Sequence, residues 1–301
     1  MTARLGLGSA QFGDAYGISN RHGRVSEDEV RDILALAAQN KLIDIDVAPY
    51  HGDVERIVGR SQPFPSPLRV QIRTLRLDKG LDWLESRLKR SIDHLGLAKT
   101  HAALVDQASD LLGPDGDALW ARLLKLKSSG LISQIGISAQ YEDQPLLLAK
   151  RFKPDIIQVQ ASIFDQRLVH SGDIAAMAEL GVKVQIRSVF MQGLLFAPSD
   201  ALPPRLTSLI PALSRIKRLM LESGADPLHA ALSYGLHIKG ADMVMVGVTS
   251  AAELRAILAA SQRPRPKIEW EALALDNEAA LDQRGWFDKD VQASPHWVRV
   301  A

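Results

Sequence analysis

The stretch IDVAPYHGDVE, residues 45–55, brings together three residue types that can transfer or orient protons. Asp46 ends a short apolar run, and Tyr50 and His51 stand side by side just before Gly52. A phenol or an imidazole can act as a general acid or base, and a nearby carboxylate can orient either group. The residues alone leave open which of Tyr50 and His51 works beside Asp46.

Polar residues or glycines end several other apolar runs, at positions where a core would favour Val or Leu. Arg73 follows RVQI, and Asp106 follows HAALV. The others are Ser9, Gln11, Ser138, Gln158, Arg187 and Gly247. If these runs are parallel strands of one barrel, their carboxyl ends lie at the same face, and the polar side chains gather there.

Short apolar runs alternate with longer amphipathic runs along the chain, and this rhythm predicts repeated βα units. Strands are expected near 3–8, 42–46, 68–73, 101–106, 132–137, 155–160, 182–187 and 243–247. Helices are expected between them, for example over 26–40, where Ser26 precedes three acidic residues, and over 78–96, which stops at Gly96. DGDALWARLLKLKSSG, DIAAMAELG and SAAELRAILAAS repeat the helical pattern. Eight such units predict an α/β fold, an (α/β)8 TIM barrel.

Two segments depart from the rhythm. Residues 189–211 carry four prolines and no clear period, which is typical of a lid or clamp loop. Residues 269–283 predict one more amphipathic helix, packed on the barrel and followed by a tail with Trp286 and Trp297. No linker or low-complexity tract interrupts the chain, so we expect a single domain over 1–301 with a C-terminal helix and tail.

The composition favours a partner of small-molecule size. Lys and Arg number 36 and Asp and Glu number 35, a net charge of +1 that gives no field to gather nucleic acid or anionic membrane. Cysteine is absent, which excludes thiolate chemistry and Cys-ligated zinc, and the eight histidines show no metal-binding spacing. Without a signal peptide or an apolar spanning run, we expect a cytoplasmic protein.

Six blocks in the chain carry a resemblance to a known family. They are RLGLGSAQFGDAYGIS, IDVAPYHGDVERIVG, LKSSGLISQIGIS, IIQVQASIFDQRL, IRSVFMQGLLF and VGVTSAAELRAIL. In this order they resemble a bacterial branch of the aldo-keto reductases, over almost the whole chain down to LDQRGW. The resemblance implies an (α/β)8 barrel that uses NADP or NAD to reduce aldehydes and ketones or to oxidise alcohols. It also implies four catalytic positions: an Asp, a Tyr proton donor, a Lys that lowers the Tyr pKa, and a His that orients the carbonyl.

Residue by residue, the resemblance places a changed set of side chains at these positions. Asp46 is retained, and because Gly52 follows it at the family's spacing, His51 occupies the tyrosine position and Tyr50 falls one place early. Arg73 stands for the lysine and Asp106 for the histidine. Carboxylates would raise the pKa of His51 and Arg73 would lower it, which leaves the direction open. Arg73 is expected to bridge Asp46 or Asp106 or to bind a substrate anion, and Tyr50 remains a substitute donor if the backbone shifts locally.

The resemblance also assigns the cofactor site. Ser138 and Gln158 match the residues that hold the nicotinamide amide, although Ala139 and Ser162 replace the asparagines that usually accompany them. Arg187 is expected to stack on the nicotinamide. The pyrophosphate is assigned to Ser188, Phe190 and Gly193, and Gly247, Thr249 and Ser250 lead into a helix whose N-terminus can bind phosphate. No Lys or Arg follows until Arg255, so the sequence offers little support for binding a 2′-phosphate.

Three functions are consistent with these residues. The first is a nicotinamide-dependent oxidoreductase that transfers a hydride to or from a small carbonyl or alcohol, with His51 in place of the usual tyrosine. The second is a non-redox acid/base enzyme, such as a lyase, epimerase or isomerase, and the third is a catalytically silent binding protein. The retained RSVFMQG segment favours the first, whereas the changed catalytic positions favour the others. The apolar 189–211 segment, whose only basic residue is Arg205, suggests a partly hydrophobic ligand.

Overall fold

The computed structural model describes residues 4–283 and residue 286. Within them, eight parallel strands close into a barrel in chain order, and β8 pairs with β1 to complete the ring. The strands are β1 Arg4–Gly8, β2 Asp44–Val47, β3 Arg69–Arg73, β4 Thr100–Val105, β5 Ile132–Ala139, β6 Ile156–Gln160, β7 Lys183–Arg187 and β8 Ala241–Gly247. Each expected strand is present, and the predicted (α/β)8 TIM barrel is confirmed.

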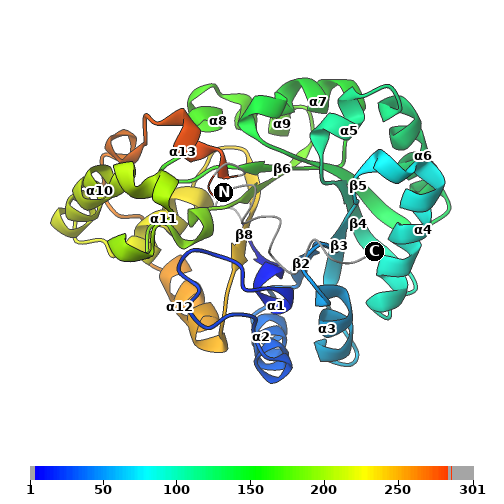
Figure 1. Ribbon diagram of the computed structural model, residues 1–301, viewed down its shortest axis with the longest axis horizontal. Helices are drawn as coiled ribbons and strands as arrows, with labels where there is room; N and C mark the ends of the chain where they lie inside the picture. The colour runs from blue at the N-terminus through cyan, green and yellow to red at the C-terminus, as the bar shows by residue number, and fades with distance from the viewer. Residues whose placement is uncertain (1–3, 284–285, 287–301) are drawn as a thin grey trace.

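Helices surround the barrel on its outer side, as Figure 1 shows. They are α1 Ala10–Gly13, α2 Glu27–Gln39, α3 Val54–Ser61, α4 Leu81–His94, α5 Ala108–Leu112, α6 Gly116–Ser128, α7 Pro145–Phe152, α8 Arg167–His170, α9 Asp173–Glu179, α10 Ile210–Glu222, α11 Pro227–Leu236, α12 Ala251–Ser261 and α13 Glu278–Leu281. The Ser26 hydroxyl accepts a hydrogen bond from the Glu29 amide at 3.3 Å, so α2 begins where the sequence predicted. The helix expected over 78–96 begins later, because Gly80 adopts a left-handed conformation (φ 84°) just before α4.

The barrel interior combines apolar packing with one layer of amides. Gln71, Gln158 and Gln185 are buried and point inward from three different strands. The Gln71 and Gln185 amides exchange hydrogen bonds of 3.1 Å, and Gln158 Nε2 donates to Gln185 Oε1 at 3.1 Å. These bonds satisfy polar groups that would be costly to bury alone. The layer also ties β3, β6 and β7 together directly beneath the polar strand ends.

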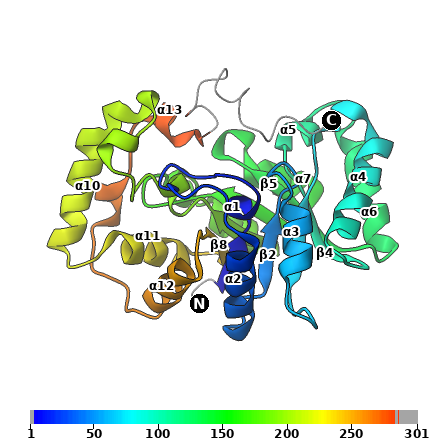
Figure 2. The same ribbon diagram turned by 60° about the horizontal axis from the view of Figure 1, so that its bottom comes forward.

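The irregular segment after β7 is largely buried. It contains three short 3-10 helices, Met191–Gly193, Ser199–Ala201 and Pro204–Leu209, before α10 begins. Most of its apolar side chains pack into the core, including Leu194, Leu195 and Leu206. In Figure 2 the segment between α1 and α2 arches across the barrel mouth toward the α10 side, and the Ile18 amide donates to the Gln192 carbonyl at 2.8 Å.

The helix predicted over 269–283 is wrong as a continuous element. The chain forms only a 3-10 turn at Trp270–Leu273 and the short α13, with extended backbone between them. The Leu275 amide donates to the Phe164 carbonyl at 3.0 Å, so the chain is drawn out along the β6 loop instead of coiling. The buried Trp286 donates from its indole to the Ala280 carbonyl at 2.8 Å, whereas Trp297 lies outside the described residues.

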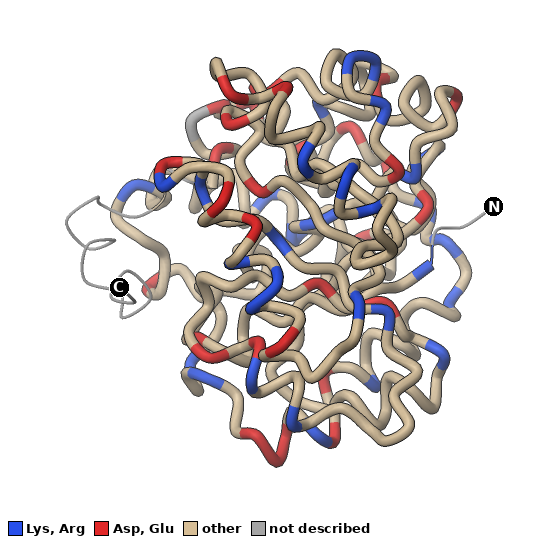
Figure 3. Tube along the Cα trace, turned by 90° about the vertical axis from the view of Figure 1, so that its right-hand side faces the viewer, with Lys and Arg blue, Asp and Glu red and all other residues tan. Residues whose placement is uncertain are grey.

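Residues of both charge signs are interspersed along the described part of the chain trace in Figure 3. This arrangement is the spatial counterpart of the formal net charge of +1. None of the helices in the described part of the chain combines the length and the apolar character that crossing a membrane requires.

Candidate active site

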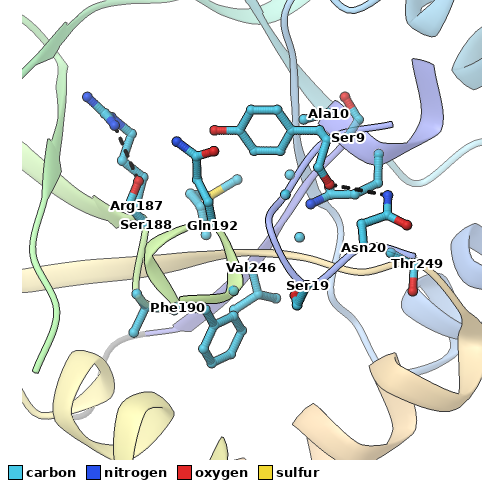
Figure 4. A pocket seen from close by; sticks show the side chains of 18 of the residues that line it. Ser9, Ala10, Ser19, Asn20, Arg187, Ser188, Phe190, Gln192, Val246 and Thr249 are labelled. Carbon is cyan, nitrogen blue, oxygen red and sulfur yellow. Dashed lines mark hydrogen bonds between the residues drawn. The ribbon is translucent and has the colours of Figure 1, made fainter. Parts of the chain in front are cut away.

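A cavity of about 590 Å³ opens at the carboxyl ends of the strands. Its polar lining includes Asp46, His51 and Arg73, which lie in or follow β2 and β3, and Thr249 and Glu253 at the start of α12. Figure 4 shows Arg187, Ser188 and Gln192 on one side of the cavity, with Asn20 and Thr249 across from them. Catalytic sites of α/β barrels lie at this face, so the cavity is the candidate active site.

Arg73, the last residue of β3, is the centre of a buried ion cluster. Its guanidinium forms a two-pronged pair with Asp46, from Nε to Oδ1 at 3.0 Å and from Nη2 to Oδ2 at 2.7 Å. Its Nη1 donates to Asp106 and, at 3.1 Å, to Ser138 Oγ, and its Nη2 also donates to Gln158 Oε1. A planar guanidinium suits this geometry, because its donors form a rigid fork that a lysine ammonium lacks.

The ion cluster fixes the protonation of its members. Burial pushes the pKa of Asp46 upward, but the charge and hydrogen bonds of Arg73 outweigh burial, and the pKa lies below its ordinary value. Burial lowers the pKa of Arg73, yet Asp46, Tyr50 and Asp106 raise it to well above the usual range. Asp46 is therefore a carboxylate and Arg73 a cation at neutral pH, and neither is available to exchange a proton.

Tyr50 is committed to the same cluster. Its hydroxyl donates to Asp106 Oδ1 at 3.2 Å, and Gln107 Nε2 donates to the other oxygen of Asp106 at 3.0 Å. Burial, followed by the negative charge of Asp106, raises the pKa of Tyr50 far above its ordinary value. Tyr50 therefore holds its proton firmly and is a poor acid toward a substrate.

His51 lies beside this cluster without joining it. Its ring packs against Tyr16 in an edge arrangement, with centroids 5.2 Å apart, and against Tyr50 at 4.7 Å. Nδ1 is buried, and neither ring nitrogen has a hydrogen-bond partner among the described residues. The turn that carries His51 is held by α1, since a Cβ on Gly13 would lie 1.8 Å from the His51 carbonyl oxygen. The imidazole is thus held in place by its neighbours, while its ring nitrogens make no hydrogen bond within the described part of the chain.

Burial sets the protonation state of His51. It lowers the pKa to about 4, with Arg73 acting in the same direction and Asp14, Asp106 and Asp46 opposing. The competition that the sequence left open between two carboxylates and one arginine is therefore decided by desolvation. At neutral pH the ring is uncharged and can accept a proton.

Arg187 and the turn after it form a second polar wall. Arg187 has one hydrogen bond, from Nη1 to Ser188 Oγ at 3.4 Å, and its buried Nε has no partner among the described residues. Burial, followed by the charge of Arg73, lowers the pKa of Arg187. Ser188, Met191 and Gln192 all have positive φ, between 43° and 59°, a strained conformation typical of functional turns.

The same turn presents unused donors to the cavity. The amides of Ser188, Val189, Phe190 and Gln192 donate no hydrogen bond within the described part of the chain, although all four residues line the cavity. Gly193 (φ 85°) admits no side chain, because a Cβ would lie 1.9 Å from Ser19 Oγ. A concave backbone with free amides beside a cation is an arrangement that binds anionic oxygens.

The residues assigned to the cofactor occupy different depths. Phe190, Gly193, Gly247 and Thr249 line the cavity directly, and Ser250 lies behind Thr249, where its hydroxyl caps α12 by accepting from the Glu253 amide at 3.1 Å. Ser138 and Asp106 do not border the cavity: Ser138 is joined to it through Arg73, and Asp106 through Arg73 and Tyr50. The two residues assigned to the nicotinamide amide, Ser138 and Gln158, both accept hydrogen bonds from Arg73.

Sequence reasoning gave no role to several residues that shape the cavity. Tyr16 lies against His51, and Asn20 and Gln192 line the rim from two separate loops. The only signal for Tyr16 was an aromatic residue in the loop after the first strand, and nothing in the sequence gives the path of that loop. No group of three or more His, Cys, Asp or Glu side chains in the described ranges is placed to hold a metal ion.

The fold and the site define a class of protein: a parallel α/β barrel with a polar cavity at the carboxyl ends of its strands and a cation beside an anion-binding turn. The chain belongs to the aldo/keto reductase family, whose model matches residues 4–274. Members of this family bind small-molecule substrates, and they generally use NAD(P)H.

Solved structures share the fold at low sequence identity. The holo form of an aldo-keto reductase from Bacillus halodurans is 20% identical, with a TM-score of 0.70 over 90% of this chain and 91% of that chain. A protein from Pseudomonas aeruginosa, provisionally named an aldo-keto reductase, is also 20% identical, with a TM-score of 0.63 over 86% of this chain and 90% of that chain. No curated relative matches this chain.

Proposed function

We propose that this protein is a nicotinamide-dependent oxidoreductase that transfers a hydride between NADP or NAD and a small carbonyl or alcohol, with His51 as the proton-transfer group. The observation that carries the proposal is that one cavity is lined by His51, by Arg187 and by Thr249 and Glu253. His51 can serve the reaction, and the 188–192 turn in the same cavity can bind anionic oxygens. This combination suits a ligand that carries a reactive ring at one end and phosphates next to it.

The residues present are suited to a dinucleotide. The unpartnered Nε of Arg187 and the free amides of the 188–192 turn are donors for pyrophosphate oxygens or a flat ring. Gly247 leaves room for the Gln11 side chain at the cavity wall, since a Cβ there would lie 2.7 Å from the Gln11 amide oxygen. When bound, the nicotinamide would supply or accept the hydride.

His51 is the group that moves the proton. As a neutral imidazole it accepts the hydroxyl proton of an alcohol as the carbinol carbon gives up its hydride, and it returns that proton to the oxygen in the reverse direction. Asp46 and Arg73 hold the floor of the site as a charge-compensated pair. At neutral pH the ring is uncharged, which is the protonation state that alcohol oxidation requires of the base.

Two matched variants test the role of His51 after cofactor binding has been shown by fluorescence titration with NADH and NADPH. His51→Phe should lower kcat/KM for alcohol oxidation roughly 100-fold or more, the usual scale for losing a general base. Tyr50→Phe should keep activity within a few fold, because the Tyr50 proton is committed to Asp106. Full activity in His51→Phe together with inactive Tyr50→Phe would reverse the assignment. If neither NADH nor NADPH binds at millimolar concentration, the redox function is refuted.

A non-redox acid/base reaction, such as elimination, epimerisation or isomerisation, is the alternative function. It is supported by the engagement of Ser138 and Gln158 with Arg73, which leaves less of these side chains for a nicotinamide amide. His51 would then remove a proton next to a carbonyl, and the cation of Arg187 would hold a substrate anion. This alternative predicts deuterium exchange from solvent into the substrate without cofactor turnover, and mass spectrometry measures that exchange.

A further inference from the structure

The amino-terminal end of α12 borders the cavity beyond the anion-binding turn. Thr249, Glu253, Ala256 and Ile257 line this part of the cavity, and Thr249 lies across from Arg187 in Figure 4. In the proposed function the nicotinamide lies beside His51 and the pyrophosphate at the 188–192 turn. The adenosine half of a dinucleotide therefore extends toward α12.

Two carboxylates of the protein already occupy this helix terminus. Glu253 Oε2 accepts a hydrogen bond from the Thr249 amide at 2.6 Å, and Glu29 Oε1, from α2, accepts one from the Ala251 amide at 2.6 Å. The Glu253 amide is bound in turn by the Ser250 hydroxyl. The donors that a helix N-terminus offers to a phosphate are thus largely used by side chains of the chain itself.

These carboxylates change the charge at the terminus as well as its hydrogen bonding. A helix N-terminus attracts anions, and here Glu29 and Glu253 supply two negative charges that satisfy it. A dianionic phosphate brought within a few ångströms would meet like charges where a phosphate-binding site presents cations. A ribose hydroxyl, in contrast, can donate a hydrogen bond to a carboxylate at no electrostatic cost.

We infer that the cavity selects a dinucleotide whose adenosine ribose carries a free 2′-hydroxyl, NAD or NADH, and that Glu253 and Glu29 exclude the 2′-phosphorylated form. The inference rests on the proposed dinucleotide function and makes these two glutamates specificity-determining residues. Glu253 acts at the cavity wall, and Glu29 acts from behind it through the Ala251 amide.

One basic residue on the rim of the cavity could instead favour binding of the 2′-phosphorylated nucleotide. Arg21 belongs to the segment between α1 and α2, is exposed, and lines the same cavity. If its guanidinium served a 2′-phosphate, the phosphorylated nucleotide would bind more tightly, and Arg21→Ala would remove that advantage. Arg21→Ala therefore distinguishes exclusion of the 2′-phosphate by the glutamates from recognition of the 2′-phosphate by Arg21.

The experiment measures binding of ADP-ribose and of its 2′-phosphate by isothermal titration calorimetry, which needs no substrate and no nicotinamide contact. The full chain should bind ADP-ribose at least about tenfold more tightly, the scale of like-charge repulsion near a protein surface. Glu253→Gln and Glu29→Gln keep an acceptor oxygen for the backbone amides and remove one charge each. Each should reduce the preference several fold, and the double variant should nearly abolish it.

Glu179→Gln is the matched control, because it removes one exposed carboxylate from α9, which does not line the cavity, and it should leave the preference unchanged. Equal or tighter binding of the 2′-phosphate by the unaltered chain would overturn the selectivity and leave the redox proposal standing. If the glutamine variants keep the full preference, the assignment of Glu253 and Glu29 as its cause is overturned, and the redox proposal again stands. If neither ligand binds, the dinucleotide function fails and the selectivity fails with it.

Discussion

At the scale of residues, one replacement explains the others. A lysine ammonium can lower the pKa of a tyrosine while remaining mobile, but the fork of Arg73 is fixed by Asp46 and Asp106 at once. That fixed cluster also accepts a hydrogen bond from the Tyr50 hydroxyl, so this phenol is not free to donate to a substrate. The imidazole of His51 lies against Tyr50 without a hydrogen bond to the cluster, and its buried Nδ1 has no partner among the described residues.

His51 should make stability depend on pH. Its pKa is about 4 in the folded protein and near the ordinary value of 6.5 when unfolded. Between these values the unfolded chain binds a proton that the folded chain does not, so the stability contributed by neutral His51 is present above about pH 6.5 and is lost as the pH falls toward 4. The loss amounts to on the order of 3 kcal/mol in the free energy of unfolding. Urea unfolding at a series of pH values measures it.

His51→Gln isolates this contribution from that of other groups. His101 and His229 also have pKa values lowered by burial, and they titrate equally in both proteins. The difference in unfolding free energy between the unaltered chain and His51→Gln should therefore shrink as the pH falls from 6.5 to 4. A difference that stays constant over this range would show that the folded ring titrates normally.

The sequence could predict which residues meet, but not their protonation. Asp46, Arg73 and Asp106 end or follow neighbouring strands, and the barrel rule brings such residues together whatever the loops do. The pKa of His51 depends instead on burial beneath Tyr16, which comes from a loop whose path has no sequence signature. The hydrogen bond from the Ala251 amide to the Glu29 carboxylate also joins distant segments, and no local sequence pattern predicts it.

At the scale of elements, the turn between β2 and α3 rests directly on α1. Gly13 faces the His51 carbonyl, and Gly52 (φ 51°) faces the Gly13 carbonyl, with room for a side chain on neither. The Ser9 hydroxyl adds a bond to the Asp46 carbonyl at 2.7 Å. The position of the catalytic imidazole is therefore set by backbone contact between two loops.

Gly13→Ala should displace that turn. The added methyl group would lie 1.8 Å from the His51 oxygen, and both partners are backbone, so relief requires movement of a whole loop. Overpacking of this kind costs roughly 1–3 kcal/mol, and activity should fall as His51 shifts. Gly113→Ala is the control, since the nearest atom there is at 3.6 Å. Equal stability and activity of the two variants, in urea unfolding and steady-state kinetics, would contradict this account.

The strands could be located from their own residues, whereas the structure of residues 269–283 could not. The β-strands are short buried runs between helices with caps, and both signals are local, so all eight could be located. Residues 269–283 also have helical spacing, but the backbone bond from Leu275 to the Phe164 loop competes with coiling, and Asn277 restarts a short helix by capping it. The local spacing of apolar residues cannot show that a backbone partner more than a hundred positions away will compete with helix formation.

At the scale of the whole molecule, the cavity is lined by residues from both the beginning and the end of the barrel's strand order. Its lining comes from the loop after β1, from the ends of β2 and β3, and from the segments that follow β7 and β8. The ring closes where β8 pairs with β1, from Arg4 opposite Met243 to Gly8 opposite Gly247. That the whole chain is one domain and that it works in the cytoplasm both stay predictions.

A ligand in this cavity should stabilise the barrel as one unit. Binding to the folded state alone raises the free energy of unfolding by about 2.7 kcal/mol at a ligand concentration of 100 times Kd. Because the cavity contacts both strands of the β1 and β8 closure, NADH should raise the temperature of a single unfolding transition and slow hydrogen exchange in Gly6 and Met245 together. Differential scanning calorimetry and exchange mass spectrometry at several NADH concentrations make the measurement. Protection confined to the segments after β7, with β1 unchanged, would mean that the nucleotide does not bridge the closure of the barrel.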